Sequence, residues 1–205
     1  MNPSDETVVS MRERLLQAAS QLFYTEGFRA VSAERIIALV GTTKVTFYRH
    51  FPSKDELMVA YLERHAALER AVIGDVLELA EADPEAGLRL AVDALAAASC
   101  APGYRGCAFI NAAAEYADPA HPVRLVVLSH RRWLTEAFCA LLGALGLPEA
   151  DAQDAAVELM ILRDGVTVGG YLDDPAAVTR AFARAADAVI GAHRIAASEW
   201  NDIRA

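Results

Sequence analysis

The stretch Ser32–Phe51, SAERIIALVGTTKVTFYRHF, has the pattern of two short helices joined by a tight turn. Ser32 and Thr43 each stand where an N-cap hydroxyl accepts from the free amides of a first turn. Gly41 ends the first apolar segment, at the position where a helix C-cap adopts positive φ. Such a helix–turn–helix offers its second helix to the major groove of DNA. The alternative interpretation of the bare pattern is a surface helical hairpin.

Polar side chains dominate the outward positions of the second helix. We expect Lys44 and Thr46 to contact base edges, with Thr43 assisting. The other polar residues would hold the phosphate backbone without reading sequence. The complete expected DNA-contacting set is Ser32, Thr42, Thr43, Lys44, Thr46, Tyr48, His50 and Lys54.

Several spaced motifs around this stretch resemble one known family. Gly27-Phe28, Gly41, the run TFYRHF (46–51) and the run SKDEL (53–57) together resemble the amino-terminal domain of the tetracycline-repressor (TetR) family of bacterial transcription regulators. The resemblance covers about residues 10 to 64, and GCAFINAAAEYADPAHPVR (106–124) is also similar to a segment of such regulators. Thr42 and Val45 depart from the family pattern, where valine and glycine are frequent, and could alter base preference or turn geometry.

Composition predicts an all-α protein, because alanine and leucine are abundant and β-branched runs are few. The net charge of −9 is unevenly distributed. Residues 1–54 hold seven Lys/Arg against five Asp/Glu, whereas residues 55–205 hold twelve against twenty-three. A mildly basic head on an acidic body is typical of a protein that contacts phosphates with one end.

The chain is expected to fold as a three-helix DNA-binding head and a larger helical body, about nine helices in all. A loose arm over 1–9 would precede the head at 10–54 and the ligand-binding and dimerisation body at 55–205. The helices are expected to begin near Ser10, Ser32, Thr43, Ser53, Pro84, Phe109, Val123, Asp151 and Pro175. The fourth is expected to end near Leu79, and the last near Ala197.

The last two expected helices are the predicted dimer interface. Glycines interrupt the otherwise apolar helical stretch DGVTVGGYL (164–172), which suggests close approach of another backbone. The predicted interface residues are Gly165, Gly169, Tyr171, Val178, Phe182, Ala185 and Val189. An ordinary intramolecular core is the alternative, whereas the family resemblance implies a four-helix dimer interface.

The resemblance further implies a ligand cavity among the middle helices. Its candidate lining residues are Tyr61, Phe109, Asn111, Glu115, Tyr116, Trp133, Phe138 and Arg163, each of which could instead be plain core. Asn111 and Glu115, four apart and among apolar neighbours, are the preferred polar pair. We expect a small, mostly hydrophobic effector.

The cysteines and the termini restrict the location and the chemistry. Cys100, Cys107 and Cys139 lack metal-ligand spacing and suggest a reducing compartment with mostly buried thiols. Cys107 follows a turn-like stretch, so an exposed, redox-active thiol is the alternative there. No secretory signal and no apolar run of bilayer length is visible, so we expect a cytoplasmic protein with no membrane contact. No cofactor and no metal site is predicted.

These features predict a homodimeric, ligand-responsive transcription regulator, most simply a repressor, that binds pseudo-palindromic double-stranded operator DNA and is released by its effector. An enzyme is the second hypothesis, but the sequence holds no G-x-S-x-G, no Walker loop and no H-E-x-x-H. A helical protein-interaction adaptor without DNA binding is the third.

Overall fold

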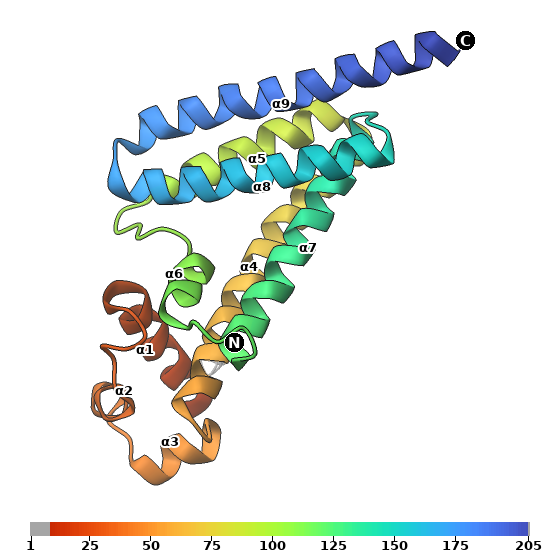
Figure 1. Cartoon of the computed structure of the whole chain (residues 1–205). Helices are drawn as coiled ribbons and strands as arrows, with labels where there is room; N and C mark the ends of the chain where they lie inside the picture. Colours follow the sequence, from red (N-terminus) through yellow and green to blue (C-terminus); the bar gives the residue numbers. More distant parts are fainter. Residues whose placement is uncertain (1–8, 205) are drawn as a thin grey trace, which may run out of the picture. The chain divides into compact units, whose positions relative to one another are not determined.

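A computed structural model describes residues 9–204 and the side chains through Ile195. Over these residues the regular structure is nine α-helices with no strand (Figure 1). The helices are α1 (Met11–Glu26), α2 (Ala33–Val40), α3 (Lys44–His50), α4 (Lys54–Ala82), α5 (Pro84–Ser99), α6 (Ala108–Glu115), α7 (Pro122–Ala144), α8 (Glu149–Leu172) and α9 (Pro175–Arg204). The all-α class and the helix count predicted from the sequence are confirmed. The predicted arm, residues 1–9, lies almost wholly outside the described residues.

Local capping residues set the helix ends. The hydroxyls of Ser10, Ser32 and Thr43 each accept a hydrogen bond from the backbone N–H three residues further on. Gly41 closes α2 in the left-handed conformation, at φ 72° and ψ 40°. Asp83 caps α5 in the same way as the serines, accepting from the third amide of that helix.

Two helices extend further than expected. Helix α4 continues to Ala82 because nothing in its last turn stops it before Pro84, which cannot continue a helix. Helix α9 runs to Arg204, past the expected end at Ala197.

The chain divides into two compact units. The first comprises the described residues up to His65 together with Asn111–Val127, and the second comprises Ala66–Ile110 together with the residues from Leu128 on. The first unit therefore contains α1, α2 and α3, and the second contains α5, α8 and α9.

An aromatic cluster forms the centre of the first unit. The rings of Phe23, Phe28 and Tyr61 contact one another with centroid separations of 5.1 to 5.8 Å. Phe47 and Phe51 of the α3 segment are also buried, so α3 packs inward on the side that carries these rings.

Small residues allow close helix packing in the second unit. Helices α8 and α9 form an antiparallel pair (Figure 1) around a core that includes Leu142, Leu147, Ala152, Ala155, Ala156, Leu159, Ala186 and Ile190. A Cβ on Gly87 would lie 2.5 Å from the Cβ of Ala80. The end of α4 and the start of α5 therefore meet at a distance that only glycine permits.

Candidate nucleic-acid interface

The turn between α2 and α3 is closed by backbone hydrogen bonds. The N–H of Gly41 donates to the carbonyls of Ile37 and Ala38, and the N–H of Thr42 donates to Ile37. Thr43 then opens α3 by accepting from the N–H of Thr46 at 3.2 Å, and the two threonine hydroxyls lie 3.1 Å apart. Two capped helices with a three-residue turn hold α3 in one orientation.

Buried aromatic residues and arginines from α1 fix the inner side of this segment. Phe47 has no exposed surface, and Phe51 is also buried. The guanidinium of Arg12 lies over the Phe51 ring, 4.9 Å from its centroid, and Arg14 Nη2 donates to the carbonyl of Val40 at 2.9 Å. Helix α1 thereby caps α2 and supports α3.

The outer side of α3 is exposed and carries charge and hydroxyl groups. Lys44 Nζ lies 2.9 Å from the carboxylate of Glu34 on α2, and both side chains are more than half exposed. This hydrogen bond raises the pKa of Lys44 and lowers the pKa of Glu34, because each stabilises the charged form of the other. Tyr48 is 44% exposed and its ring packs edge-on against Phe47. Val45, between them, is exposed as well.

The remaining residues expected to contact DNA are less free, because Ser32 and Lys54 have structural partners and Thr42 and His50 are partly buried. Ser32 is occupied as the cap of α2, accepting from Arg35 N–H, while Thr42 and His50 are half-buried. Lys54 Nζ donates to the carbonyl of Phe28. Partial burial lowers the pKa of Lys54 below its usual value. Lys54 thus ties the start of α4 to the loop before α2.

Glu115, in the second sequence segment of the first unit, also binds the loop before α2. Its two carboxylate oxygens accept from the backbone N–H groups of Phe28 at 2.9 Å and Arg29 at 2.8 Å. Arg29 returns a hydrogen bond, 2.7 Å long, from its guanidinium to the carbonyl of Glu115. Tyr116, the next residue, donates from its hydroxyl to the sulfur of Met58 at 3.2 Å. These contacts join the end of α6 to the DNA-binding segment.

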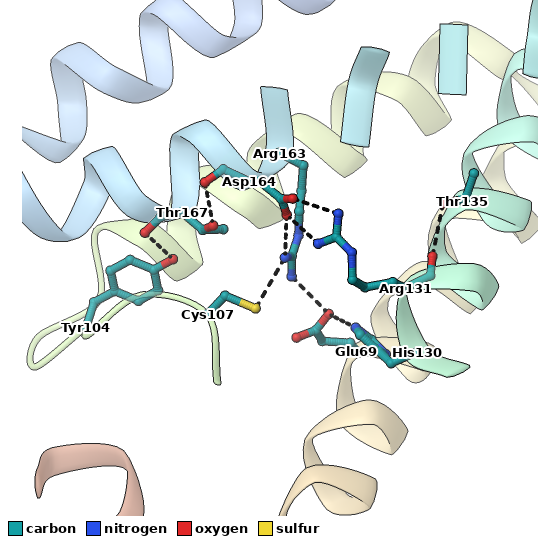
Figure 2. A network of polar contacts seen from close by, with 9 residues as sticks. All are labelled: Glu69, Tyr104, Cys107, His130, Arg131, Thr135, Arg163, Asp164 and Thr167. Atoms are coloured by element: carbon teal, nitrogen blue, oxygen red, sulfur yellow. Dashed lines mark hydrogen bonds and ion pairs between the residues drawn. The ribbon is translucent and has the colours of Figure 1, made fainter. Parts of the chain in front are cut away.

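A second polar site lies inside the second unit (Figure 2). We call it the Arg163 cluster, and its members are Glu69, Cys107, His130, Arg131, Arg163 and Asp164. The guanidinium of Arg163 lies 3.2 Å from the sulfur of Cys107 and 3.5 Å from one oxygen of Glu69. The same Glu69 oxygen lies 3.0 Å from Nε2 of His130. Arg131 forms a two-pronged ion pair with Asp164, at 2.7 and 2.9 Å.

Arg163 keeps its charge although its side chain is buried, whereas Glu69, Arg131 and Asp164 are partly exposed. Burial alone would lower the pKa of Arg163, but the neighbouring Cys107, Glu69 and Asp164 raise it. The imidazole of His130 stacks on Phe109 with a centroid distance of 3.8 Å and an interplanar angle of 9°. Its Nδ1 is buried without a hydrogen-bond partner among the described residues.

Comparison with known proteins identifies the family of this fold. The sequence model of the bacterial regulatory proteins of the tetR family matches residues 15–61, from α1 into α4. A TetR-family transcriptional regulator from Streptomyces coelicolor, known by its crystal structure, is 37% identical in sequence. The superposition covers 89% of this chain and 95% of that chain with a TM-score of 0.81. The chain belongs to the TetR family.

Curated relatives are transcription regulators as well. The transcriptional regulator LmrA of Bacillus subtilis is 26% identical over 156 residues, which is 75% of this chain and 82% of LmrA. The transcriptional activator FasR of Mycolicibacterium smegmatis is 41% identical over 63 residues, and this match spans only 27% of FasR. As a TetR-family protein, the chain is a DNA-binding transcription regulator and not an enzyme, as the sequence predicted.

The expected effector-binding residues of this TetR-family chain are divided between the two units. Tyr61, Asn111, Glu115 and Tyr116 belong to the first unit, and Phe109, Trp133, Phe138 and Arg163 belong to the second. Asn111 is exposed rather than surrounded by apolar neighbours, and Glu115 is engaged by backbone amides. The preferred polar pair therefore does not share one environment. The reason is that α6 is only eight residues long and its end turns toward the loop before α2.

His130, Glu69 and Asp164 of the second unit were not among the site residues predicted from the sequence. The histidine is 2% exposed, and Trp133 lies close to it with a ring separation of 5.8 Å. Only their polarity within helical apolar faces could have indicated these residues. Cys107, expected to be exposed, is buried, and its sulfur lies 3.2 Å from the guanidinium of the buried Arg163.

Of the expected dimer-interface residues, some are exposed, some contact the neighbouring helix of the same chain, and some pack against the core. Gly165 has open space around the site of a Cβ, and Tyr171 is 47% exposed. Gly169 contacts Val178 of the same chain, since a Cβ there would lie 3.0 Å from the valine methyl. Phe182 and Val189 pack against the core of the second unit, and Ala185 is half-buried.

None of the helices that the structure describes is long and apolar enough to cross a membrane. Within the same residues, no group of three or more histidine, cysteine or acidic side chains is arranged to hold a metal ion.

Proposed function

We propose that the protein is a homodimeric, effector-responsive repressor that binds a pseudo-palindromic operator. The observation that carries the proposal is the two-sidedness of α3. Phe47 is fully buried on one side, whereas Lys44 and Tyr48 are exposed on the other. A helix held in this way can lie in a major groove without loss of its packing.

We assign the α3 residues and their neighbours to base contacts or to phosphate contacts according to their position and their present hydrogen-bond partners. Lys44 and Thr46, at the start of α3, are the base-reading candidates, because the first residues of a recognition helix contact base edges. Lys44 would exchange Glu34 for a base acceptor such as guanine O6 or N7. Tyr48 and His50 would hold phosphates, as would Ser32 and Lys54 if they gave up part of their present contacts.

Dimerisation is supported by an exposed apolar stripe on α8. Val157, Ile161, Val168 and Leu172 recur at spacings of four and seven residues and are 43 to 68% exposed. Residues at these spacings share one face of a helix. Gly165, in open space, falls on the same face and would let a partner helix approach closely. A second copy of the chain would cover this stripe and present a second α3.

Effector binding is proposed for the second unit. Its core is rich in alanine and leucine, which suits a small, mostly hydrophobic effector. Phe109 offers an aromatic face, and the unpartnered Nδ1 of His130 offers one buried hydrogen bond to a polar atom of the effector. None of the three cysteines is disulfide-bonded, which supports a cytoplasmic location for the regulator.

Selection of bound duplexes from a randomised pool tests DNA recognition. We expect a two-fold related sequence to be enriched, with an affinity that falls steeply as salt is raised while sequence preference persists. A protein-interaction adaptor would enrich no duplex, and that result would contradict the proposal.

Substitution of Ile161 tests the dimer interface independently. Ile161→Glu places a charge in the middle of the stripe, so sedimentation should show a monomer with weakened operator binding. Leu68→Glu is the matched control, because Leu68 is also about 60% exposed but lies on α4. Dissociation by both substitutions, or by neither, would contradict this choice of interface.

A further inference from the structure

Val45 is the most exposed of the large apolar side chains that the structure describes, at 79%. It is the second residue of α3, directly after Lys44. A single exposed valine on a protein surface is ordinary. This one stands at the start of the helix that carries the polar DNA-contact candidates, where recognition helices contact base edges.

The packing of α3 directs Val45 outward. Residues two apart in a helix are separated by about 200° around its axis, so Val45 lies almost opposite Phe47. Phe47 has no exposed surface and fixes the inner side of the helix. Val45 therefore projects toward whatever the outer side of α3 contacts, and it makes no contribution to the core.

The chemistry of the major groove leaves one partner for an apolar side chain. Each base edge there presents hydrogen-bond donors or acceptors, and the apolar feature is the C5-methyl of thymine. The polar neighbours Lys44, Thr46 and Tyr48 can serve the hydrogen-bonding groups. A branched valine offers two methyl groups and no donor or acceptor.

We propose that Val45 reads the C5-methyl of a thymine in each operator half-site, an inference that rests on the proposed operator binding. Contact with the methyl removes apolar surface of both groups from water, which favours thymine over cytosine at that position. The helix–turn–helix of this chain would thus read one base through an apolar contact and others through hydrogen bonds.

Replacing thymine by deoxyuridine tests the contact at a single methyl group. Deoxyuridine keeps every hydrogen-bonding group of thymine and lacks only the C5-methyl. With a duplex selected by the wild-type chain, each thymine is replaced in turn, and affinities are measured for wild type, Val45→Ala and Val72→Ala. Val72 is an exposed valine of α4 and serves as the matched control.

We expect wild type and Val72→Ala to lose about fourfold in affinity at one symmetry-related thymine per half-site, as burial of one methyl predicts. Val45→Ala should lose most of this dependence at that position, because alanine lacks the two branch methyl groups of valine and keeps only Cβ. Its melting temperature should be unchanged, because the side chain is exposed and alanine favours helix.

Two results would overturn the inference while operator binding stands. Either no thymine shows a methyl dependence with wild type, or Val45→Ala keeps the full wild-type dependence. A wild-type chain that selects no duplex would instead overturn operator binding itself.

Discussion

Helix α3 and the Arg163 cluster both carry charged side chains, but they place them in opposite surroundings. The charges of α3 lie in seven consecutive residues, and its Lys44–Glu34 pair is more than half exposed. The cluster draws Glu69, Cys107 and Arg163 from three separate parts of the second unit, and Arg163 is buried. An exposed charge stays hydrated, so it costs little free energy and remains accessible to DNA. A buried charge loses its hydration and needs hydrogen-bonding or oppositely charged partners to compensate. Substitutions in α3 should therefore change binding, and those in the cluster should change stability.

Phe47 lies in α3 but is buried, so its substitution should change both the stability of the protein and its binding to DNA. Phe47→Ala removes a fully buried ring from beneath α3 and should destabilise the protein by about 3–5 kcal/mol. Operator binding should be lost together with the fold of this unit. Urea denaturation measures the stability, and a loss below about 1 kcal/mol would mean that α3 is not fixed by this ring.

The largest effect in the cluster is expected from Arg163. Arg163→Met leaves the carboxylates of Glu69 and Asp164 with one cationic partner fewer and should cost about 2 kcal/mol, less than a fully buried pair because both acids are partly exposed. Operator affinity of the folded protein should stay within about twofold. Arg131→Met is the control; its more exposed pair with Asp164 should cost about 1 kcal/mol or less. A reversed order of the two would contradict the importance of burial.

For α3 the expected change is in affinity alone. Lys44→Ala should weaken operator binding by about 1–3 kcal/mol and relax preference at one base pair. Glu34→Gln should strengthen operator binding. It releases Lys44 from its ion pair and removes a negative charge from the exposed surface beside α3. Electrophoretic shift assays on selected duplexes measure both. Equal losses on every sequence would make Lys44 a phosphate contact.

A smaller effect is expected at Glu115, which belongs to neither group. Glu115→Gln keeps the size of the side chain but replaces one amide-accepting oxygen by a donor, and it should cost about 1 kcal/mol of stability. Because the loop before α2 loosens, operator affinity should fall about two- to fivefold. Hydrogen exchange at the amides of Phe28 and Arg29 reports the loosening directly. Unchanged protection there would remove Glu115 from the support of the DNA-binding segment.

The sequence predicted the parts of the molecule whose physics is local. The caps at Ser32, Gly41 and Thr43 and the anchor Phe47 were all found because each acts within a few residues of its own position. The partners of Lys54, by contrast, depend on which carbonyl the fold places beside it.

Long-range partnerships could not be predicted in the same way. Glu115 contacts amides 86 and 87 residues away, and Arg163 contacts a sulfur 56 residues away. No spacing rule relates such positions, so Glu115 was assigned to a ligand site and His130 was not singled out. Apolar residues that recur every three or four positions indicate that a helix has a buried face, but they do not identify what the face packs against.

Photocross-linking of operator DNA tests most directly whether the outer side of α3 enters the major groove. Iodine in place of the thymine methyl in a selected duplex reacts with the side chain that lies against it. Trypsin cleaves after Lys44 and Arg49, so residues 45–49, VTFYR, form one peptide that mass spectrometry can recognise. The account predicts that this peptide carries the cross-link, once in each half-site. A cross-link confined to peptides outside α3 would contradict it.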